Sequence, residues 1–249
     1  MKDYLRIMIL SDTHELHDRI SILEEDEIDL LIHAGDFTTD FARTGRSYAI
    51  KDFLEWFAAQ PATHKIFIAG NHDWGFFDTS LRAYAEKMVE TVGQGKITYL
   101  CHQETIVEGI KVCGTPWQPV FHDYAFNAPK EELRERYAEI PEDTQILITH
   151  CPPLGILDRV SDKPREYAGS SSLKKRVGQL PKLRLHAFGH IHPRFGIKRV
   201  GQCQFVNASQ VNHKYAISYA PIILDIIFNE VYDNNLNECV VPTTTTTIP

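Results

Sequence analysis

Short apolar runs recur along the chain of 249 residues, and five of them end in a cluster of polar residues. The runs are rich in Ile, Leu and Phe and alternate little between apolar and polar positions. This pattern is typical of strands that are buried on both faces of a sheet. We therefore predict strands at residues 5–10, 30–33, 65–69, 145–149 and 184–188.

Helical spacing of apolar residues separates the early runs. Residues 50–57 carry an i, i+3, i+4, i+7 stripe, and a second stripe at residues 81–92 follows a candidate cap at residues 79–80. A third stripe at residues 133–140 follows Pro129, a residue suited to a first helical turn. Strand and helix alternate over about the first hundred residues, which predicts βαβ units and a largely parallel sheet.

The pattern changes in the later part of the chain, where strand-like segments follow one another with little helix between them. Turn residues at 108–109 and 200–202 join two pairs of these segments, as in β-hairpins. We therefore predict a second, more antiparallel sheet from residues 104–107, 110–113, 195–200, 204–206 and 222–228. With no linker or repeat in the sequence, residues 1–240 are predicted to form one domain. The threonine-rich residues 241–249 are predicted to be a disordered tail.

Composition excludes several classes of protein. Hydrophobic residues make up 43% and charged residues 24%, which excludes collagen-like, coiled-coil and wholly disordered chains. The net charge of −7 argues against a large nucleic-acid surface. Five cysteines without a close pair argue against a disulfide framework and a thiolate zinc site, and favour a reducing compartment. The first apolar run is too short for a signal peptide or membrane helix, so we expect a soluble, cytoplasmic protein. The sequence leaves the oligomeric state open.

The polar clusters after the five runs share one chemistry. Ligands bind at the carboxyl ends of strands in α/β sheets, so neighbouring strands would bring these clusters together. Carboxylate and amide oxygens with imidazole nitrogens suit Mn, Fe, Zn, Co or Ni. Alone, each cluster has an ordinary alternative as a turn, a loop, a strand end or a surface hairpin. The candidate side chains are Asp12, His14, Asp36, Asn71, His72, His150, His190 and His192.

Two local spacings support a shared ion. Residues i and i+2 of a strand point to the same face, so Asp12 and His14 can aim at one ion. His190 and His192 can do the same if their stretch is extended.

The ordered motifs Asp-x-His, Gly-Asp, Gly-Asn-His-Asp, Thr-His and Gly-His-x-His span residues 12–192. As a set they resemble the calcineurin-like metallophosphoesterase superfamily. Residues 33–38, 114–119, 148–154 and 188–192 resemble its metallophosphoesterase-domain (MPPED) branch, which is similar to class III cyclic nucleotide phosphodiesterases. The resemblance implies a mixed α/β fold in which a two-sheet β-sandwich is flanked by helices, in four αββα layers.

The resemblance also implies a centre of two divalent metal ions, for which we favour manganese. One ion would be held by Asp12, His14 and His192. The other would be held by Asn71, His150 and His190, with Asp36 bridging both. His72 is not a ligand in this pattern but faces the substrate, as a charge stabiliser or general acid.

One position departs from the family pattern. Many members read Gly-Asp-x-x-Asp, where the second Asp orients the histidine that corresponds to His72. Thr39 stands at that place, and Asp73 or Asp40 is a candidate substitute. If neither orients His72, protonation of the leaving group would be weak.

The leading functional hypothesis is hydrolysis of small phosphodiesters, with cyclic nucleotides as candidates, by in-line attack of a hydroxide that bridges the two metals. The alternatives are a phosphomonoesterase or phosphoprotein phosphatase, and a non-catalytic scaffold of the same fold. Trp117 lies in a proline-rich loop with Phe121 and Phe126 and is a candidate platform on which a base could stack. Asn71 and His72 are further candidate substrate-binding residues. Ten basic residues between positions 163 and 199 could steer an anion, or could lie partly on a solvated helix face.

Overall fold

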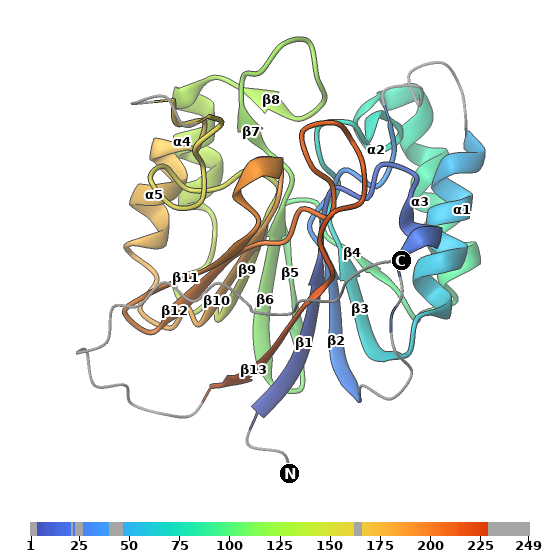
Figure 1. The fold of residues 1–249 in the computed structure, drawn as a ribbon, viewed down its shortest axis with the longest axis horizontal. Helices are drawn as coiled ribbons and strands as arrows, with labels where there is room; N and C mark the ends of the chain where they lie inside the picture. The colour runs from blue at the N-terminus through green and yellow to red at the C-terminus, as the bar shows by residue number, and fades with distance from the viewer. Residues whose placement is uncertain (1–3, 21, 23–26, 40–46, 162–165, 229–249) are drawn as a thin grey trace.

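The computed structural model describes residues 4–20, 22, 27–39, 47–161 and 166–228. Two β-sheets lie face to face in the middle of the molecule, with helices on the outer side of each (Figure 1). The predicted four-layer α/β sandwich is therefore confirmed. The predicted tail at residues 241–249 lies outside the described residues.

The first sheet is parallel except at one edge. Strand β13 runs antiparallel to β1, and the other pairs are parallel. Its spatial order is β13 (Ile222–Ile227), β1 (Tyr4–Leu10), β2 (Ile28–His33), β3 (Ala62–Phe67) and β4 (Thr98–Tyr99). Three helices cover its outer face: α1 (Ser47–Ala59), α2 (Trp74–Phe77) and α3 (Thr79–Gly93).

The second sheet has a parallel centre and antiparallel edges. Its spatial order is β11 (Gly196–Val200), β12 (Cys203–Asn207), β10 (Leu185–Phe188), β9 (Ile146–Thr149), β6 (Ile110–Thr115) and β5 (Gln103–Val107). Helices α4 (Lys130–Ala138) and α5 (Ser171–Val177) cover its outer face. The remaining short elements are η1 (His17–Arg19), η3 (His192–Arg194), β7 (Gln118–Pro119) and β8 (Asn127–Ala128).

The prediction of a more antiparallel second sheet is wrong in two respects. Strand β13 pairs with β1 and so belongs to the first sheet. Strands β9 and β10 enter the second sheet between the two predicted hairpins, and the crossovers through α4 and α5 make its centre parallel. The hairpins themselves are confirmed, and both Glu108 and Gly109 have the positive φ that a tight hairpin turn requires.

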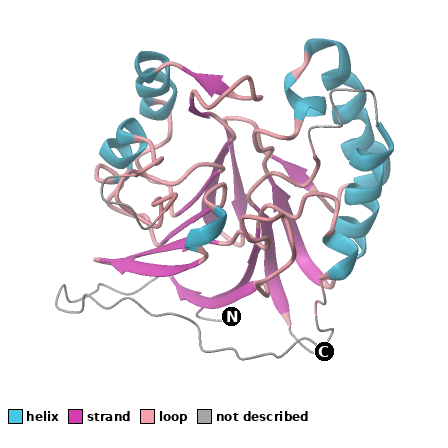
Figure 2. Cartoon of the chain, turned by 45° about the horizontal axis from the view of Figure 1, so that its top comes forward, coloured by secondary structure: helices cyan, strands magenta, loops and turns pink. Residues whose placement is uncertain are grey.

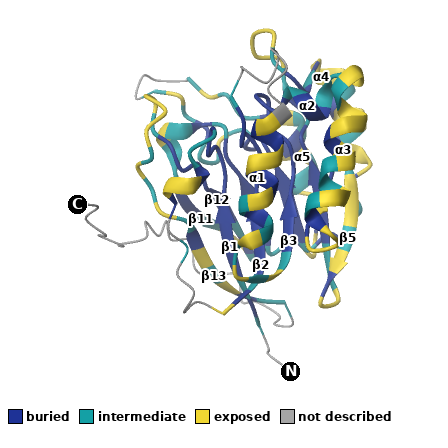
Figure 3. Ribbon diagram, turned by 90° about the vertical axis from the view of Figure 1, so that its right-hand side faces the viewer, coloured by how far each residue is buried: buried dark blue, intermediate teal, exposed yellow. Residues whose placement is uncertain are grey.

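Three apolar layers hold the sandwich together: one between the two sheets, one under α1 and α3, and one under α4 and α5. Ile7 and Ile9 point between the two sheets, whereas Met8 points to the layer under α1, where Phe53 and Phe57 pack. Each central strand therefore buries both faces, which explains the near-continuous apolar runs. In Figure 3 the central strands β1 and β2 are mostly buried, whereas the edge strand β5 and the outer faces of α1 and α3 are largely exposed. Within the described ranges, the helices are all too short or too polar to cross a lipid bilayer.

The helix starts differ slightly from the predicted caps. The side chain of Asp78, rather than residues 79–80, caps α3 by accepting a hydrogen bond from the Ser80 amide. Pro129 precedes the first residue of α4 instead of lying within its first turn. The apolar stripes themselves fall on α1, α3 and α4, although Ile140 is buried just beyond the end of α4.

Candidate metal centre

The predicted ligand side chains gather where the carboxyl ends of parallel strands from both sheets meet. The ligands that follow β1, β2 and β3 come from the first sheet, and the ligands that follow β9 and β10 come from the second sheet. Figure 2 turns this upper end of the two sheets, with its converging loops, towards the viewer. Six of the seven predicted ligands fall into two clusters whose candidate ligand atoms lie close enough to share an ion. The seventh, Asn71, joins the second cluster through its amide oxygen, which contacts His150.

Asp12, His14 and His192 form the first cluster, with their ligand atoms within 4.8 Å of one another. The Nε2 atoms of the two histidines lie 3.4 Å apart, and His192 Nε2 lies 3.4 Å from Asp12 Oδ1. Asp12 is completely buried and His14 nearly so. Two imidazole nitrogens and a carboxylate oxygen therefore converge on one point away from solvent.

Asp36, His150 and His190 form the second cluster. His150 Nε2 lies 3.3 Å from Asp36 Oδ2 and 2.9 Å from the amide oxygen of Asn71. Asp36 Oδ2 also lies 4.0 Å from Nε2 of His14, which belongs to the first cluster. The Asp36 carboxylate is thus placed between the two clusters.

The ring orientation of two histidines fits metal binding. Nδ1 of His14 lies 3.2 Å from the Thr38 carbonyl oxygen, and Nδ1 of His150 lies 2.9 Å from that of Ala34. Because a carbonyl can only accept, Nδ1 carries the proton in the neutral ring. The Nε2 lone pair is then left for the centre, as in proteins that bind metals through imidazole. The donor set therefore fits divalent ions.

Electrostatics at the centre also favour cations. Burial by itself would raise the pKa of both Asp12 and Asp36, but the neighbouring histidines, His192 for Asp12 and His150 for Asp36, hold both below the usual range. Burial opposes the charge on His150, yet the Asp36 carboxylate raises the pKa of that imidazole to about 9. Burial and the His150 charge lower the pKa of His190 to about 3. Two buried carboxylates thus require positive charge nearby, which divalent ions supply when bound.

Backbone turns, rather than extended strands, aim the ligands. Asp12, His14, Asp36 and His190 all have φ between 43° and 68°, a conformation that non-glycine residues seldom adopt and that clusters at functional sites. The strand argument for the i, i+2 pairs is therefore wrong. Asp12 and His14 converge through a turn, while His190 and His192 diverge to different clusters because His192 starts η3.

Two glycines make room for the carboxylates. A Cβ at Gly189 would overlap the Asp12 carboxylate and the Ser11 hydroxyl, and a Cβ at Gly70 would overlap the Asp36 carboxylate. The amide of His190, next to Gly189, donates hydrogen bonds to both oxygens of Asp12. The glycines therefore allow the chain to approach the ligands closely.

His72 forms a further group with His14 and Asp36, whose candidate ligand atoms also lie within 4.8 Å of one another. Its Nε2 is 3.8 Å from Asp36 Oδ2, and its ring centroid is 4.8 Å from that of His14. The structure gives Thr39 a different role from the family's Asp, because its amide and hydroxyl both donate to Glu15. Asp40 lies outside the described residues.

Asp73 does not take the role of orienting His72. Its carboxylate accepts hydrogen bonds from the amides of Asp36, Thr38 and Gly70 and from the Thr38 hydroxyl. Burial and the charge of Asp36 raise the pKa of Asp73 to about 7. Asp73 therefore fixes the loop that carries Asp36.

Among the described residues, the Trp117 ring contacts none of the site histidines. Its ring packs against Phe77 and Phe126, and the Arg136 guanidinium lies 3.6 Å from the ring centroid. Phe126 is buried in the core. The rings that contact the histidines belong to Phe121, Tyr124 and Tyr215; sequence reasoning named only Phe121 and missed both tyrosines, for which no local motif gives a signal.

Two further buried histidines support the loops behind the centre. His33 receives a hydrogen bond from the Gly35 amide at Nδ1, so its Nε2 donates to Thr13, between Asp12 and His14. His186 Nε2 lies 2.9 Å from the hydroxyl of Thr149, next to His150. Burial lowers the pKa of both imidazoles to about 3, so they are neutral.

The described structure places the basic residues between positions 163 and 199 at several separate sites. Arg194 shares η3 with His192 and donates to the carbonyls of Arg159 and Ser161. Lys163 and Arg165 lie outside the described residues. Lys174 and Lys175 are exposed on α5, as expected for a solvated helix face, but Arg176 is half-buried and donates to the Ile140 carbonyl. Arg184 precedes β10 and so lies at the opposite end of that strand from the ligands.

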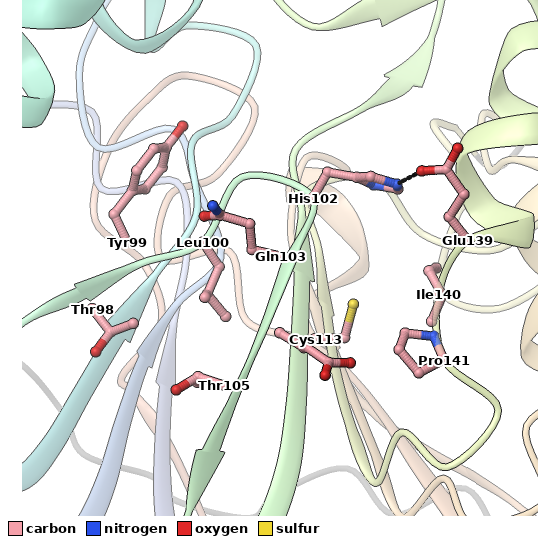
Figure 4. A pocket seen from close by; sticks show the side chains of 11 residues that line it. Thr98, Tyr99, Leu100, His102, Gln103, Thr105, Cys113, Glu139, Ile140 and Pro141 are labelled. Atoms are coloured by element: carbon pink, nitrogen blue, oxygen red, sulfur yellow. Dashed lines mark hydrogen bonds and ion pairs between the residues drawn. The ribbon is translucent and has the colours of Figure 1, made fainter.

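A separate hollow of about 580 Å³ lies at the edge of the second sheet (Figure 4). It is lined by residues of β4, β5 and the segment after α4, and by none of the metal-centre residues. Burial raises the pKa of Cys113, which faces it, to about 12, so this thiol is not a nucleophile at neutral pH. His102 and Glu139 pair across its rim at 2.9 Å.

Comparison with known proteins agrees with this site. Residues 5–194 match the family model described as calcineurin-like phosphoesterase. The chain is 37% identical over 241 residues to human metallophosphoesterase domain-containing protein 1, covering 90% of this chain and 71% of that protein. It is 34% identical over 233 residues to UPF0046 protein C25E10.12 of Caenorhabditis elegans, covering 89% and 81%.

Solved structures share the fold at low sequence identity. The crystal structure of TT1561 of Thermus thermophilus superposes with a TM-score of 0.60 at 14% identity, covering 82% of this chain and 88% of that one. The motif order, the clustered ligands and the family match all lead to one assignment. The chain belongs to the calcineurin-like phosphoesterase family, and its curated relatives agree with the metallophosphoesterase-domain branch.

Proposed function

We propose that this protein is a phosphodiesterase that depends on two divalent metal ions, with manganese as the favoured metal. Asp12, His14 and His192 would hold one ion. Asn71, His150 and His190 would hold the other, with Asp36 shared. The observation that carries the proposal is the position of the Asp36 carboxylate, within 3.3 Å of His150 and 4.0 Å of His14.

When bound, the two ions would supply Lewis acidity towards a phosphate and a water of lowered pKa. The chain's own residues fix the rest of the arrangement. The Asp36 carboxylate accepts a hydrogen bond from the His72 amide, which ties the candidate acid to the shared ligand. The buried His72 imidazole is then placed to stabilise charge on the phosphate or to protonate a leaving oxygen.

The branch relationship supports a diester rather than a monoester, because of the resemblance to cyclic nucleotide phosphodiesterases. Thr39 bears on the leaving group instead, because it is held by Glu15 and offers no carboxylate to orient His72 as the family's Asp does. A nitrophenolate leaving group needs little protonation and would tolerate this, whereas a ribose alkoxide depends more on His72, since general acid catalysis contributes about 10²–10⁴-fold.

Metal analysis followed by a panel of esters tests the proposal. With manganese bound, we expect bis(p-nitrophenyl) phosphate and cyclic nucleotides to be hydrolysed with higher turnover per bound metal than p-nitrophenyl phosphate. His150→Ala should remove metal and activity together, while His64→Ala, a matched change on β3 outside the clusters, should keep both. Monoester turnover well above diester turnover would favour the phosphatase alternative, and an inactive metal-loaded protein would favour the scaffold.

A further inference from the structure

Tyr215 lies over the histidines of the first cluster. Its ring centroid is 4.8 Å from that of His14, 5.2 Å from that of His192 and 6.2 Å from that of His72. The side chain nevertheless stays about half exposed, with 48% relative exposure. An aromatic ring that contacts three site histidines and also faces solvent occupies the boundary between the metal centre and the outside.

The loop between β12 and β13 holds Tyr215 in this position. Tyr215 has a φ of 58°, which is unfavourable for a bulky residue. The Asn212 side chain accepts hydrogen bonds from the amides of Lys214 and Ala216, and the Tyr215 amide donates to the Asn212 carbonyl. Strained residues persist where the surroundings fix them, and they concentrate at ligand sites.

A second aromatic surface also contacts His72. The Tyr124 ring is 4.8 Å from the His72 ring, and Phe121 stacks on Tyr124 at 5.8 Å with an interplanar angle of 8°. Phe121 also reaches the second cluster, with its ring 5.8 Å from that of His190. Phe121 is 47% exposed, so this stacked pair borders the centre instead of filling the core.

Charge and shape together indicate what these rings bind. The centre offers histidines and carboxylates suited to metal-bound phosphate, whereas its borders offer aromatic rings with exposed surface. Aromatic rings bind planar apolar groups through burial and offset or edge-to-face contacts. Ligand sites commonly combine a few polar groups with aromatic walls in this way.

We propose that Tyr215 and Tyr124, the latter backed by Phe121, are specificity-determining residues that bind a planar aromatic substituent of the phosphate ester. Asn212 is the positioning residue for Tyr215. The inference rests on the proposed function for the phosphate site but adds the class of organic group that the site selects, namely an aryl or nucleobase group over an alkyl group.

Calorimetry with two phosphonates that cannot be hydrolysed tests the inference. The manganese-loaded protein is titrated with phenylphosphonate and with methylphosphonate, and the ratio of the two Kd values isolates the ring. We expect phenylphosphonate to bind about tenfold more tightly, since aromatic stacking at such sites has roughly this effect. Tyr215→Ala and Tyr124→Ala should each lower the ratio by several-fold.

Matched variants separate the ring from the fold. Tyr215→Phe should keep the ratio because it keeps the ring, and so should Tyr84→Ala, which removes a similarly exposed tyrosine on α3. Asn212→Ala should lower the ratio, and Asn212→Asp should restore it, because the carboxylate can accept the same two amide hydrogen bonds.

Three results would overturn the inference: equal affinity for the two phosphonates, an equal loss in Tyr215→Phe and Tyr215→Ala, or phenylphosphonate binding that persists without metal. The outcome is independent of turnover. Ring-dependent binding without diester hydrolysis would reject only the proposed function. Diester hydrolysis with equal phosphonate affinities would reject only the aromatic subsite.

Discussion

His186 on β10 is a buried imidazole that should make the protein sensitive to acid. It is fully buried and contacts the rings of Phe188 and Phe205. Because the Thr149 hydroxyl donates to the Cys151 carbonyl, His186 Nε2 donates to Thr149. Its Nδ1 has no hydrogen-bond partner among the described residues. Protonation of Nδ1 would therefore place an unpaired charge in the core.

The size of the effect follows from the change in pKa on folding. Burial lowers the pKa of His186 from 6.5 to about 3, so the unfolded chain binds the proton more tightly than the folded protein. The stabilisation is fully present above pH 6.5 and is lost as the pH falls towards 3. Linkage gives about 1.4 kcal/mol per pH unit in this window, or about 2.5 kcal/mol between pH 7 and pH 4.5.

His186→Gln tests this calculation, because the glutamine amide can still donate to Thr149 but does not titrate. Urea unfolding of metal-free protein at pH 7 and pH 4.5 gives the free energy of unfolding for each variant. We expect the acid-induced loss to be about 2.5 kcal/mol smaller in His186→Gln than in the unmodified chain. His64→Gln, at a half-buried histidine paired with Glu108, is the control for the same chemical change. Equal acid-induced losses in the unmodified chain and His186→Gln would refute the reasoning, whatever the stability at pH 7.

Three further outcomes are expected at the centre. Asp36→Asn should lower turnover more than replacement of His14 or any other single terminal ligand, because Asp36 lies between the two clusters. Near-normal turnover with both metals bound would contradict the role of Asp36 as a ligand shared by both ions. His72→Ala should slow cyclic nucleotide hydrolysis more than bis(p-nitrophenyl) phosphate hydrolysis, whereas equal slowing would show that His72 acts on phosphate charge. Gly189→Ala should reduce metal content measured by elemental analysis at least tenfold, because its Cβ would overlap the Asp12 carboxylate; unchanged metal content would show that the loop can yield.

The sequence by itself determined the features that depend on neighbouring residues. Apolar runs with little alternation predicted strands covered on both faces, and Ile7 and Met8 do point to opposite apolar layers. Gly109, after Glu108, permits the positive φ of a tight turn, so that hairpin could be predicted locally. The order of polar motifs at strand ends identified the ligand side chains, because strand ends are where the chain can leave the sheet and present polar groups.

The tertiary structure alone decided the features that depend on which distant segments meet. Strand β13 pairs with β1, and β10 lies between β9 and β12. The sequence could not predict this order, because long-range pairing sets it and a local pattern does not encode that pairing. His190 and His192 separate to different clusters because a left-handed turn and η3, not an extended strand, carry them. Tyr215 reaches His14 from the far end of the sequence, while Trp117, the more conspicuous aromatic residue, is packed under Arg136. Residue type predicts what a side chain can do, but the chain's path decides which side chains face the centre.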